Sequence, residues 1–213
     1  MDKRETIVTT AMNLFGQKGF EGTSVREIAA GAEVNLAMIN YYFGSKENLF
    51  ESVVEYKSAF LKGIFEELVT NTSLSQMEKL DIVVDSYIER MFQNPQFHHL
   101  LHRELSLEHR PQMKEAIAEI LLRNFVSLKA IVQNGIGSGE FNNVDIELTI
   151  ATLIGTINHL LISGIMCRKI LQKSKNFNPY RSKKLKERIS EHLKNLLRSH
   201  LLKASPQKNK KNI

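Results

Sequence analysis

Cysteine and proline are scarce in this sequence of 213 residues, which contains one cysteine, Cys167, and four prolines. A single cysteine excludes a disulfide within the chain. The N-terminal stretch MDKRETIVTTAMNLF also lacks the continuous apolar run of a secretion signal. We therefore expect a protein of the reducing cytoplasm. The four prolines stand where helices are predicted to begin or to be separated, because the missing N–H costs least there.

Alternating runs of β-branched residues with hairpin turns are missing as well, whereas apolar residues recur with helical spacing along nearly the whole chain. With 42% apolar residues the chain can bury a core. These patterns predict an all-α protein of about nine helices. The first four helices are predicted at residues 3–18, after Ser24, after Asn35 and from Ser45 to Leu68. The others are predicted at residues 75–93, 95–107, 111–136, 145–172 and 181–204, with Gly135, Gly137 and Gly139 marking one loop.

Positive charge is scarce in the first part of the chain. The net charge is +6, but residues 168–213 hold 15 lysines and arginines against 2 glutamates. Residues 1–48 hold 5 cations against 6 acids. The positive net charge therefore reports on the C-terminal end, which we expect to form mainly a solvated helix face.

Catalytic motifs are also lacking. The sequence contains no nucleophile elbow, phosphate-binding loop or metalloprotease motif, which predicts a protein without catalytic residues or a cofactor. His98, His99 and His102 have a spacing that could bind a divalent metal ion on one helix face. No further ligand is arranged around them in the sequence, so we predict no metal site, and histidines that are solvated or at the edge of a pocket.

What the sequence does contain is a helix-turn-helix pattern near its N-terminus. Ser24 and Glu27 form a capping box for a short helix, and Asn35 begins a second one after a tight connection. The segment FGQKGFEGTSVREIAAGAEVNLAMINYYFGSKENLF, residues 15–50, resembles the DNA-binding domain of the TetR/AcrR repressor family. The matches are the TS-x-x-x-IA opening, the valine in the turn, the YYF end and the SKE-x-L start of the fourth helix. Three residues depart from the family pattern, namely Glu33 in place of a turn glycine, Leu36 in place of a cation and Asn40 in place of an aromatic residue.

The helix after Asn35 is the candidate recognition helix. Its inward arc contains Ile39, Tyr42 and Phe43, and its outward arc is available to DNA. Tyr41 could bind a phosphate through its hydroxyl, and Asn40 could pair with an adenine edge. The resemblance implies that Thr23, Arg26 and Lys46 bind phosphates. The full candidate set is Thr23, Arg26, Asn35, Leu36, Ala37, Met38, Asn40, Tyr41, Tyr42 and Lys46, in which the apolar members could read thymine methyl groups.

Residues 148–166 contain no charged side chain, and such a segment is also a candidate transmembrane helix. The resemblance offers another explanation, in which this helix is buried by its own domain and by a second subunit. A second apolar stripe on the last helix would complete the dimer's four-helix bundle. The predicted interface residues are Leu153, Ile157, Leu185, Ile189, Leu193, Leu196 and Leu197. The candidate effector-pocket residues are His98, His102, Arg103, Asn158 and His159.

Together these features predict a ligand-responsive transcriptional regulator, most simply a repressor. A homodimer would bind a near-palindromic operator in double-stranded DNA and be released by a small apolar effector of unknown identity. We divide the chain into a DNA-binding domain at 1–48, a ligand-binding and dimerisation domain at 49–204 and a disordered basic tail at 205–213. For such a regulator we expect no membrane partner. The alternative is a membrane-associated helical protein anchored by residues 148–166.

Overall fold

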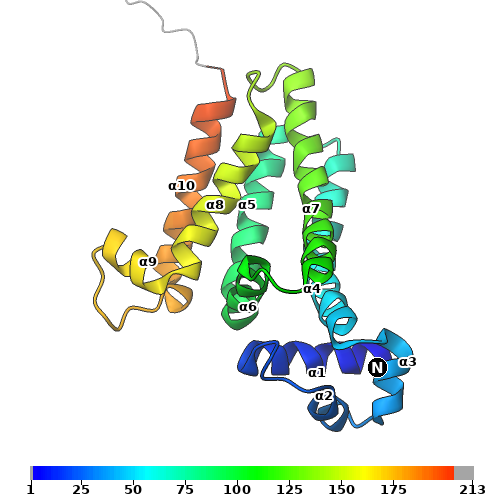
Figure 1. Cartoon of the computed structure of the whole chain (residues 1–213). Helices are drawn as coiled ribbons and strands as arrows, with labels where there is room; N and C mark the ends of the chain where they lie inside the picture. The colour runs from blue at the N-terminus through cyan, green and yellow to red at the C-terminus, as the bar shows by residue number, and fades with distance from the viewer. Residues whose placement is uncertain (1, 204–213) are drawn as a thin grey trace, which may run out of the picture.

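The computed structural model describes residues 2–203, and within this range the chain folds into ten α-helices and one short 3-10 helix (Figure 1). The helices are α1 (Lys3–Lys18), α2 (Val25–Gly31), α3 (Leu36–Phe43), α4 (Lys46–Thr70), α5 (Gln76–Gln93), α6 (Pro95–Ser106), α7 (Pro111–Gly137), α8 (Ile146–Ile162), α9 (Gly164–Ile170), η1 (Pro179–Arg181) and α10 (Lys183–Leu201). The all-α prediction is confirmed. The predicted tail at 205–213 lies outside the described residues.

Side-chain caps at the helix N-termini explain why most helices begin where they do. A cap side chain accepts a hydrogen bond from a backbone N–H that has no partner inside the helix. Ser24 and Ser75 each form a complete capping box with the glutamate three residues later. Simple caps are made by Asp2, Asn35, Ser45, Asp145, Ser163 and Ser182.

One predicted helix is two helices in the structure. The apolar segment predicted to run from 145 to 172 breaks at Ser163, and α8 and α9 meet at an angle of 101°. Ser163 accepts a hydrogen bond from the backbone N–H of Met166 and so begins a new helix. Among residues 2–203, no single helix is long and apolar enough to cross a membrane. Within this range only α8 and α9 taken together, despite their bend, have the length and apolar composition of a membrane span.

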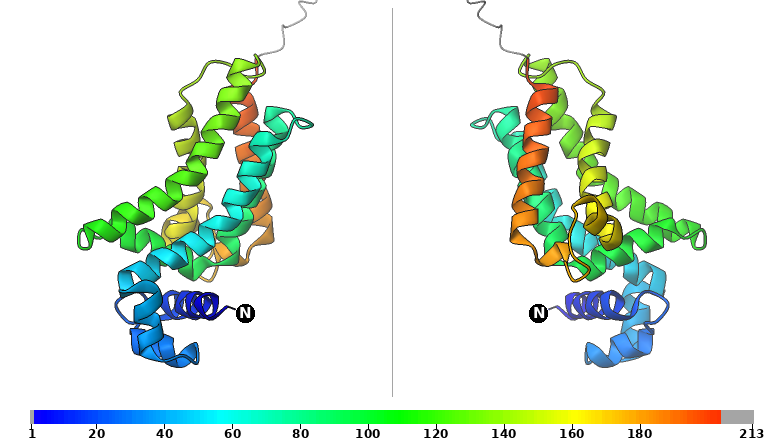
Figure 2. Two further views of the ribbon diagram at one scale, coloured as in Figure 1. Left: turned by 90° about the vertical axis from the view of Figure 1, so that its right-hand side faces the viewer. Right: turned by 90° about the vertical axis from the view of Figure 1, so that its left-hand side faces the viewer.

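The molecule has two apolar cores, one toward each end. α1, α2 and α3 lie together at one end, and α5, α7, α8 and α10 extend away from them (Figures 1 and 2). The first core joins the three N-terminal helices to the start of α4 and to residues of α6 and α7, including Phe97 and Ile117. The second core lies between α4, α5, α7, α8 and α10. α4 crosses the predicted boundary at 48/49 without a break, so the division there remains a prediction about function.

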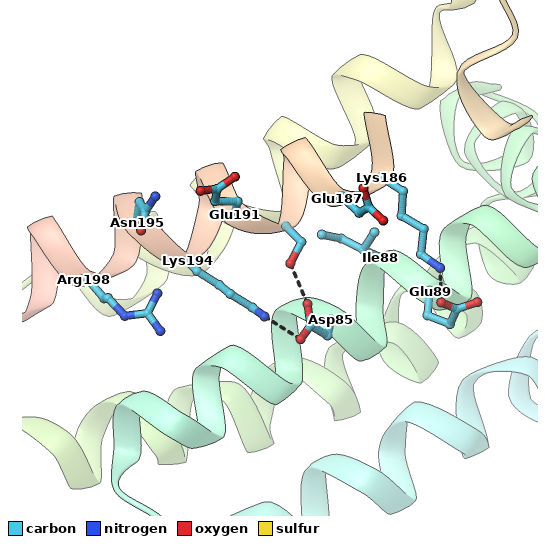
Figure 3. A pocket seen from close by; sticks show the side chains of 10 residues that line it. Asp85, Ile88, Glu89, Lys186, Glu187, Glu191, Lys194, Asn195 and Arg198 are labelled. Atoms are coloured by element: carbon cyan, nitrogen blue, oxygen red, sulfur yellow. Dashed lines mark hydrogen bonds and ion pairs between the residues drawn. The ribbon is translucent and has the colours of Figure 1, made fainter. Parts of the chain in front are cut away.

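The basic C-terminal helix is tied to the acidic helix α5. Lys194 pairs with Asp85, and Ser190 donates a hydrogen bond to the same carboxylate at 2.6 Å (Figure 3). Lys186 pairs with Glu89 and Arg198 with Asp81. These cations were expected on a solvated face, and the structure instead pairs three of them across a helix contact. Since the partners are partly exposed, each pair contributes about 1 kcal/mol or less.

Two of the three glycines predicted to form one loop belong to α7. Gly135 and Gly137 are helical, and only Gly139, at φ 77°, lies after the helix in a left-handed conformation. Gly135 is buried because the ring of Phe141 packs directly on its Cα, and the Phe141 N–H donates to the Gly135 carbonyl at 2.9 Å. A close approach of an aromatic ring therefore explains the glycine at 135.

Adding a methyl group at these two glycines should have opposite effects on stability. In Gly135→Ala the new Cβ would overlap the Phe141 ring, and we expect the free energy of unfolding to fall by about 1–3 kcal/mol. Gly137 has open space around that position, and Gly137→Ala should raise it by roughly 0.5–1 kcal/mol. Urea denaturation of both variants measures the difference, and equal effects would contradict the packing described here.

Candidate nucleic-acid interface

The connection between α2 and α3 is tight and uses an uncommon backbone conformation. Glu33 has φ 53°, the left-handed region that favours glycine. The Val34 N–H donates to the carbonyl of Ala29 at 3.0 Å and closes the turn. Glu33, which stands where the family pattern has a glycine, thus adopts a conformation that costs a residue with a Cβ about 1–2 kcal/mol.

Helix α3 is anchored by one face and presents the other to solvent. Ile39 and Phe43 are buried in the first core, as predicted. Tyr41 is 85% exposed, and Ala37 and Asn40 are exposed beside it. Tyr42, predicted on the inward arc, is 38% exposed, and its ring centroid lies 5.4 Å from that of Tyr41. Both tyrosines therefore lie at the surface of the helix.

The remaining members of the candidate set lie around this helix. Leu36 and Met38 are half-buried, and Met38 packs against the first core. Asn35 uses its side-chain oxygen to accept from the Met38 N–H at 2.8 Å. Arg26 is exposed on α2. Lys46, at the start of α4, lies with its Nζ 4.3 Å from the centre of the Phe20 ring.

Thr23 does not fit the predicted phosphate-binding role. Its side chain is only 1% exposed. The hydroxyl donates toward the carbonyl oxygens of Gly19 at 2.8 Å and Leu14 at 3.2 Å, so it holds the turn after α1. A hydroxyl that is buried and bonded to main-chain oxygens is not available to DNA.

A cation outside the candidate set lies next to α3. The guanidinium of Arg4 stacks on the ring of Phe43, with 5.4 Å between its carbon and the ring centre. Arg4 is exposed on α1. Arg4 could be expected near the DNA-binding helices from its place in the sequence, but its contact with Phe43, 39 positions away, could not, because that contact depends on how the helices pack.

Three of the five candidate effector residues meet in a polar network inside the second half of the molecule. His98 is 4% exposed; its Nε2 lies 3.0 Å from the side-chain oxygen of Asn158, and its Nδ1 lies 2.9 Å from the Tyr180 hydroxyl. The His102 ring stands edge-on to the His98 ring, with centroids 4.7 Å apart. Tyr87 also bonds Asn158. Tyr87 and Tyr180 were not predicted, because no local pattern connects them to the histidines.

Arg103 and His159 do not join this network. The Arg103 side chain on α6 is more than half exposed and bonds Glu104 instead. His159 is exposed on α8. No group of three or more histidine, cysteine, aspartate or glutamate side chains within residues 2–203 is placed to hold a metal ion.

The polar network carries no charge at neutral pH. Burial lowers the pKa of His98 to about 4, although the bond to Asn158 acts in the opposite direction. Burial also raises the pKa of Tyr87 to about 12 and that of Tyr180 above its ordinary value. In the neutral ring, Nε2–H can donate a hydrogen bond to the side-chain oxygen of Asn158, and Nδ1 can accept a hydrogen bond from the Tyr180 hydroxyl. The network is therefore a set of neutral hydrogen bonds.

The predicted dimer residues need a correction. Leu153, Ile157, Leu185, Ile189, Leu193 and Leu197 are all buried inside the protomer's own second core. The helical periodicity identified a buried face correctly, but that face packs within the protomer. Leu196 alone of the set is partly exposed, at 38%, and Leu148 on α8 is 66% exposed. These two leucines line a cavity of about 300 Å³ between α8 and α10, together with Thr152 and His200.

Comparison with known proteins decides the family. The family model described as bacterial regulatory proteins, tetR family, matches residues 7–53. The model described as YsiA-like protein, C-terminal region, matches residues 55–179. The chain belongs to the TetR family. It is thus a transcriptional regulator with an N-terminal DNA-binding helix-turn-helix and a C-terminal ligand-binding domain, as predicted from residues 15–50.

Curated TetR-family relatives and solved structures agree with this assignment. The probable HTH-type transcriptional regulator YttP of Bacillus subtilis is 33% identical over 164 residues, which cover 75% of each chain. The transcriptional repressor NicS of Pseudomonas putida is 29% identical over 71% of each chain. Among solved structures, FadR from Bacillus halodurans has a TM-score of 0.74 at 20% identity, covering 93% of this chain and 97% of that one. FadR from Bacillus subtilis, in complex with stearoyl-CoA, has a TM-score of 0.71 at 22% identity, covering 89% and 96%.

None of these findings supports the membrane-anchored alternative. The relatives are transcriptional regulators, which is consistent with the lack of catalytic motifs in the sequence. Residues 148–166, on which the alternative rested, are split by the bend at Ser163, and Ile157 and Leu161 within them are buried in the second core.

Proposed function

We propose that this chain is a cytoplasmic repressor that binds a near-palindromic operator as a homodimer and leaves it when a small apolar effector binds. The observation that carries the DNA-binding part is the geometry of α3. Ile39 and Phe43 fix the helix to the first core, while Asn40 and the highly exposed Tyr41 point away from that core. A short helix held in this way fits the major groove.

The exposed face of α8 and α10 is the proposed dimer contact. Leu148 and Leu196 are apolar side chains in solvent, and they line the same cavity as Leu153 and Leu197 beneath them. A second copy of the chain on this face would remove these leucines from water, which is favourable. It would also place two α3 helices so that they can enter successive major grooves, about 34 Å apart.

The neutral polar network is the proposed effector-sensing part of the ligand-binding domain. His98, His102 and Asn158 are uncharged, and His98 is buried. Asn158 lies on α8 between the core residues Ile157 and Leu161. They therefore suit an effector with an apolar body and one uncharged hydrogen-bonding group. Arg103 and His159 lie outside the network and are left out of this proposal. The B. subtilis FadR, which has a similar fold, is in complex with stearoyl-CoA. The acyl chain of that molecule is such an apolar body, whereas its charged phosphates would have to lie outside the neutral network, and stearoyl-CoA is the first compound to test.

Two substitutions on α3 test the DNA-binding proposal on fragments selected from genomic DNA. Tyr41→Phe removes a hydroxyl that would bond a phosphate, a loss of about 1.5–3 kcal/mol, and should weaken all sequences alike by at least about tenfold. Asn40→Ala should instead change the preference at one symmetric pair of bases, by about 1–3 kcal/mol. Binding is measured by fluorescence anisotropy at fixed salt.

Asn195→Ala is the matched control, because Asn195 is an exposed asparagine on α10, the last helix of the second half. It should bind like the wild type. Wild-type affinity and preference in both α3 variants would show that another surface contacts DNA.

A further inference from the structure

A buried carboxylate lies where α6 meets the DNA-binding head, which we define as α1, α2 and α3. Glu104, in the last turn of α6, is 1% exposed. One of its oxygens accepts from Arg103 Nε at 3.2 Å and Nη2 at 3.1 Å, and the other accepts from Arg110 Nη2 at 2.6 Å. A carboxylate is costly to bury, so its retention depends on both arginines.

Arg110 connects this carboxylate to the head. Its guanidinium also pairs with Glu21, in the turn between α1 and α2. The same group lies over the ring of Phe20, with its carbon 4.5 Å from the ring centre. The backbone of Arg110 is left-handed, with φ 64° and ψ 55°, immediately before α7. A side chain with a Cβ adopts this conformation only at a cost, which these contacts offset.

The turn between α1 and α2 is held at two points. Arg103 packs on Gly19, since a Cβ at Gly19 would lie 2.5 Å from Arg103 Nη2. Phe20, whose ring lies under the Arg110 guanidinium, is 1% exposed in the first core, where it stacks on Phe15 and meets Phe50 edge-on. A movement of the α6–α7 connection would therefore pull on the centre of the head's core.

Helix α6 thus has two attachments. His98 in its first turns bonds Asn158 and Tyr180 in the second half of the molecule, and Glu104 at its other end holds the head through Arg110. We propose that the network of Glu104, Arg103, Arg110 and Glu21 sets the orientation of the DNA-binding head, with Arg110 as the positioning residue. This inference rests on the proposed dimer, because orientation matters only when two heads must bind one DNA molecule.

The test compares one-headed with two-headed binding. The probes are a fragment selected from genomic DNA by the wild-type protein, and the same fragment with one half-site scrambled. Binding by a second, correctly placed head can raise affinity by 10²–10⁴. We expect Arg110→Gln to lower affinity for the intact fragment at least about tenfold and to leave half-site affinity within about twofold of wild type.

Two further variants complete the experiment. Glu21→Gln removes the outer partner of Arg110. The Glu21 side chain is 68% exposed, so we expect this variant to fold like the wild type. Its ratio of intact to half-site affinity should fall, as in Arg110→Gln. Arg123→Gln is the matched control, because it breaks an exposed arginine–glutamate pair between α7 and α4. Its ratio should equal that of the wild type.

The outcomes separate this inference from the proposed function. If the wild type binds the intact fragment no better than the half-site, the proposed dimeric operator binding is wrong and the inference falls with it. If the wild type shows the preference but Arg110→Gln loses both affinities in parallel, or neither, Arg110 does not position the head. Should circular dichroism show that Arg110→Gln is unfolded, an unchanged ratio in Glu21→Gln overturns the inference.

Discussion

Replacing Leu196 with glutamate should separate the proposed dimer into folded monomers, whereas the same replacement at the neighbouring Leu197 should prevent folding. Leu196 is 38% exposed on the face between α8 and α10, and Leu197 is 5% exposed in the second core. In Leu196→Glu, two carboxylates would be buried only if the dimer formed, at several kcal/mol each before relaxation. In Leu197→Glu the charge is buried by folding itself, against a typical stability of about 5–15 kcal/mol.

Light scattering measures the mass of both variants, and far-UV circular dichroism measures their helix content. Leu148→Glu, on the facing helix and 66% exposed, should behave like Leu196→Glu. If Leu196→Glu and Leu148→Glu both remain dimeric, the contact lies on another face. If Leu197→Glu is helical and monomeric, Leu197 belongs to the dimer interface, as the sequence predicted.

Stability should decrease as the pH is lowered from about 6.5 to about 4, and His98 should account for much of the decrease. Its pKa is about 4 in the folded protein and 6.5 for an ordinary histidine, because burial opposes the charged form. Between these values the unfolded chain binds a proton that folded His98 does not, so protonation favours unfolding. The stabilisation is complete above pH 6.5 and is lost toward pH 4, by roughly 3 kcal/mol.

The other titratable groups near His98 either add to this loss of stability at low pH or do not titrate in this range. Burial also lowers the pKa of His99 and His102. Tyr180 and Cys167, on the other side of the network, have raised pKa values and stay neutral in this range. Acids such as Glu27, whose pKa is lowered to about 2 by Lys18 and Ser24, lose their contribution below their ordinary value of 4.5, mostly outside the window.

Urea denaturation at pH 7, 6, 5 and 4 measures the effect in the wild type and in His98→Gln. His98→Gln is less stable at pH 7 but should show a shallower pH dependence, since the titrating ring is gone. His192→Gln removes an exposed histidine on α10 and should leave the slope unchanged. An equal slope in His98→Gln and the wild type would show that folding does not lower the pKa of His98.

The sequence by itself determined the helices and the family. Ser24, Asn35 and Ser45 begin helices at the predicted residues, because a cap bonds to an N–H only two or three positions away. Apolar spacing identified the buried faces of α3, α8 and α10 for the same reason, since residues three and four apart share a face. The sequence did not signal the break at Ser163, because an uncharged apolar pattern continues through it.

Only the tertiary structure decided what each buried or charged side chain contacts. The spacing of the leucines of α10 is equally compatible with a subunit interface and with a protomer core. In the structure they are buried in the second core together with residues of α5 and α8. Thr23 matches a family position, yet its hydroxyl is turned to Gly19 and Leu14. His98 meets Tyr180, 82 residues later, and Arg110 meets Glu21, 89 residues earlier. Such pairs form when whole helices pack against one another, so periodicity and capping, which act over about one helical turn, cannot indicate them.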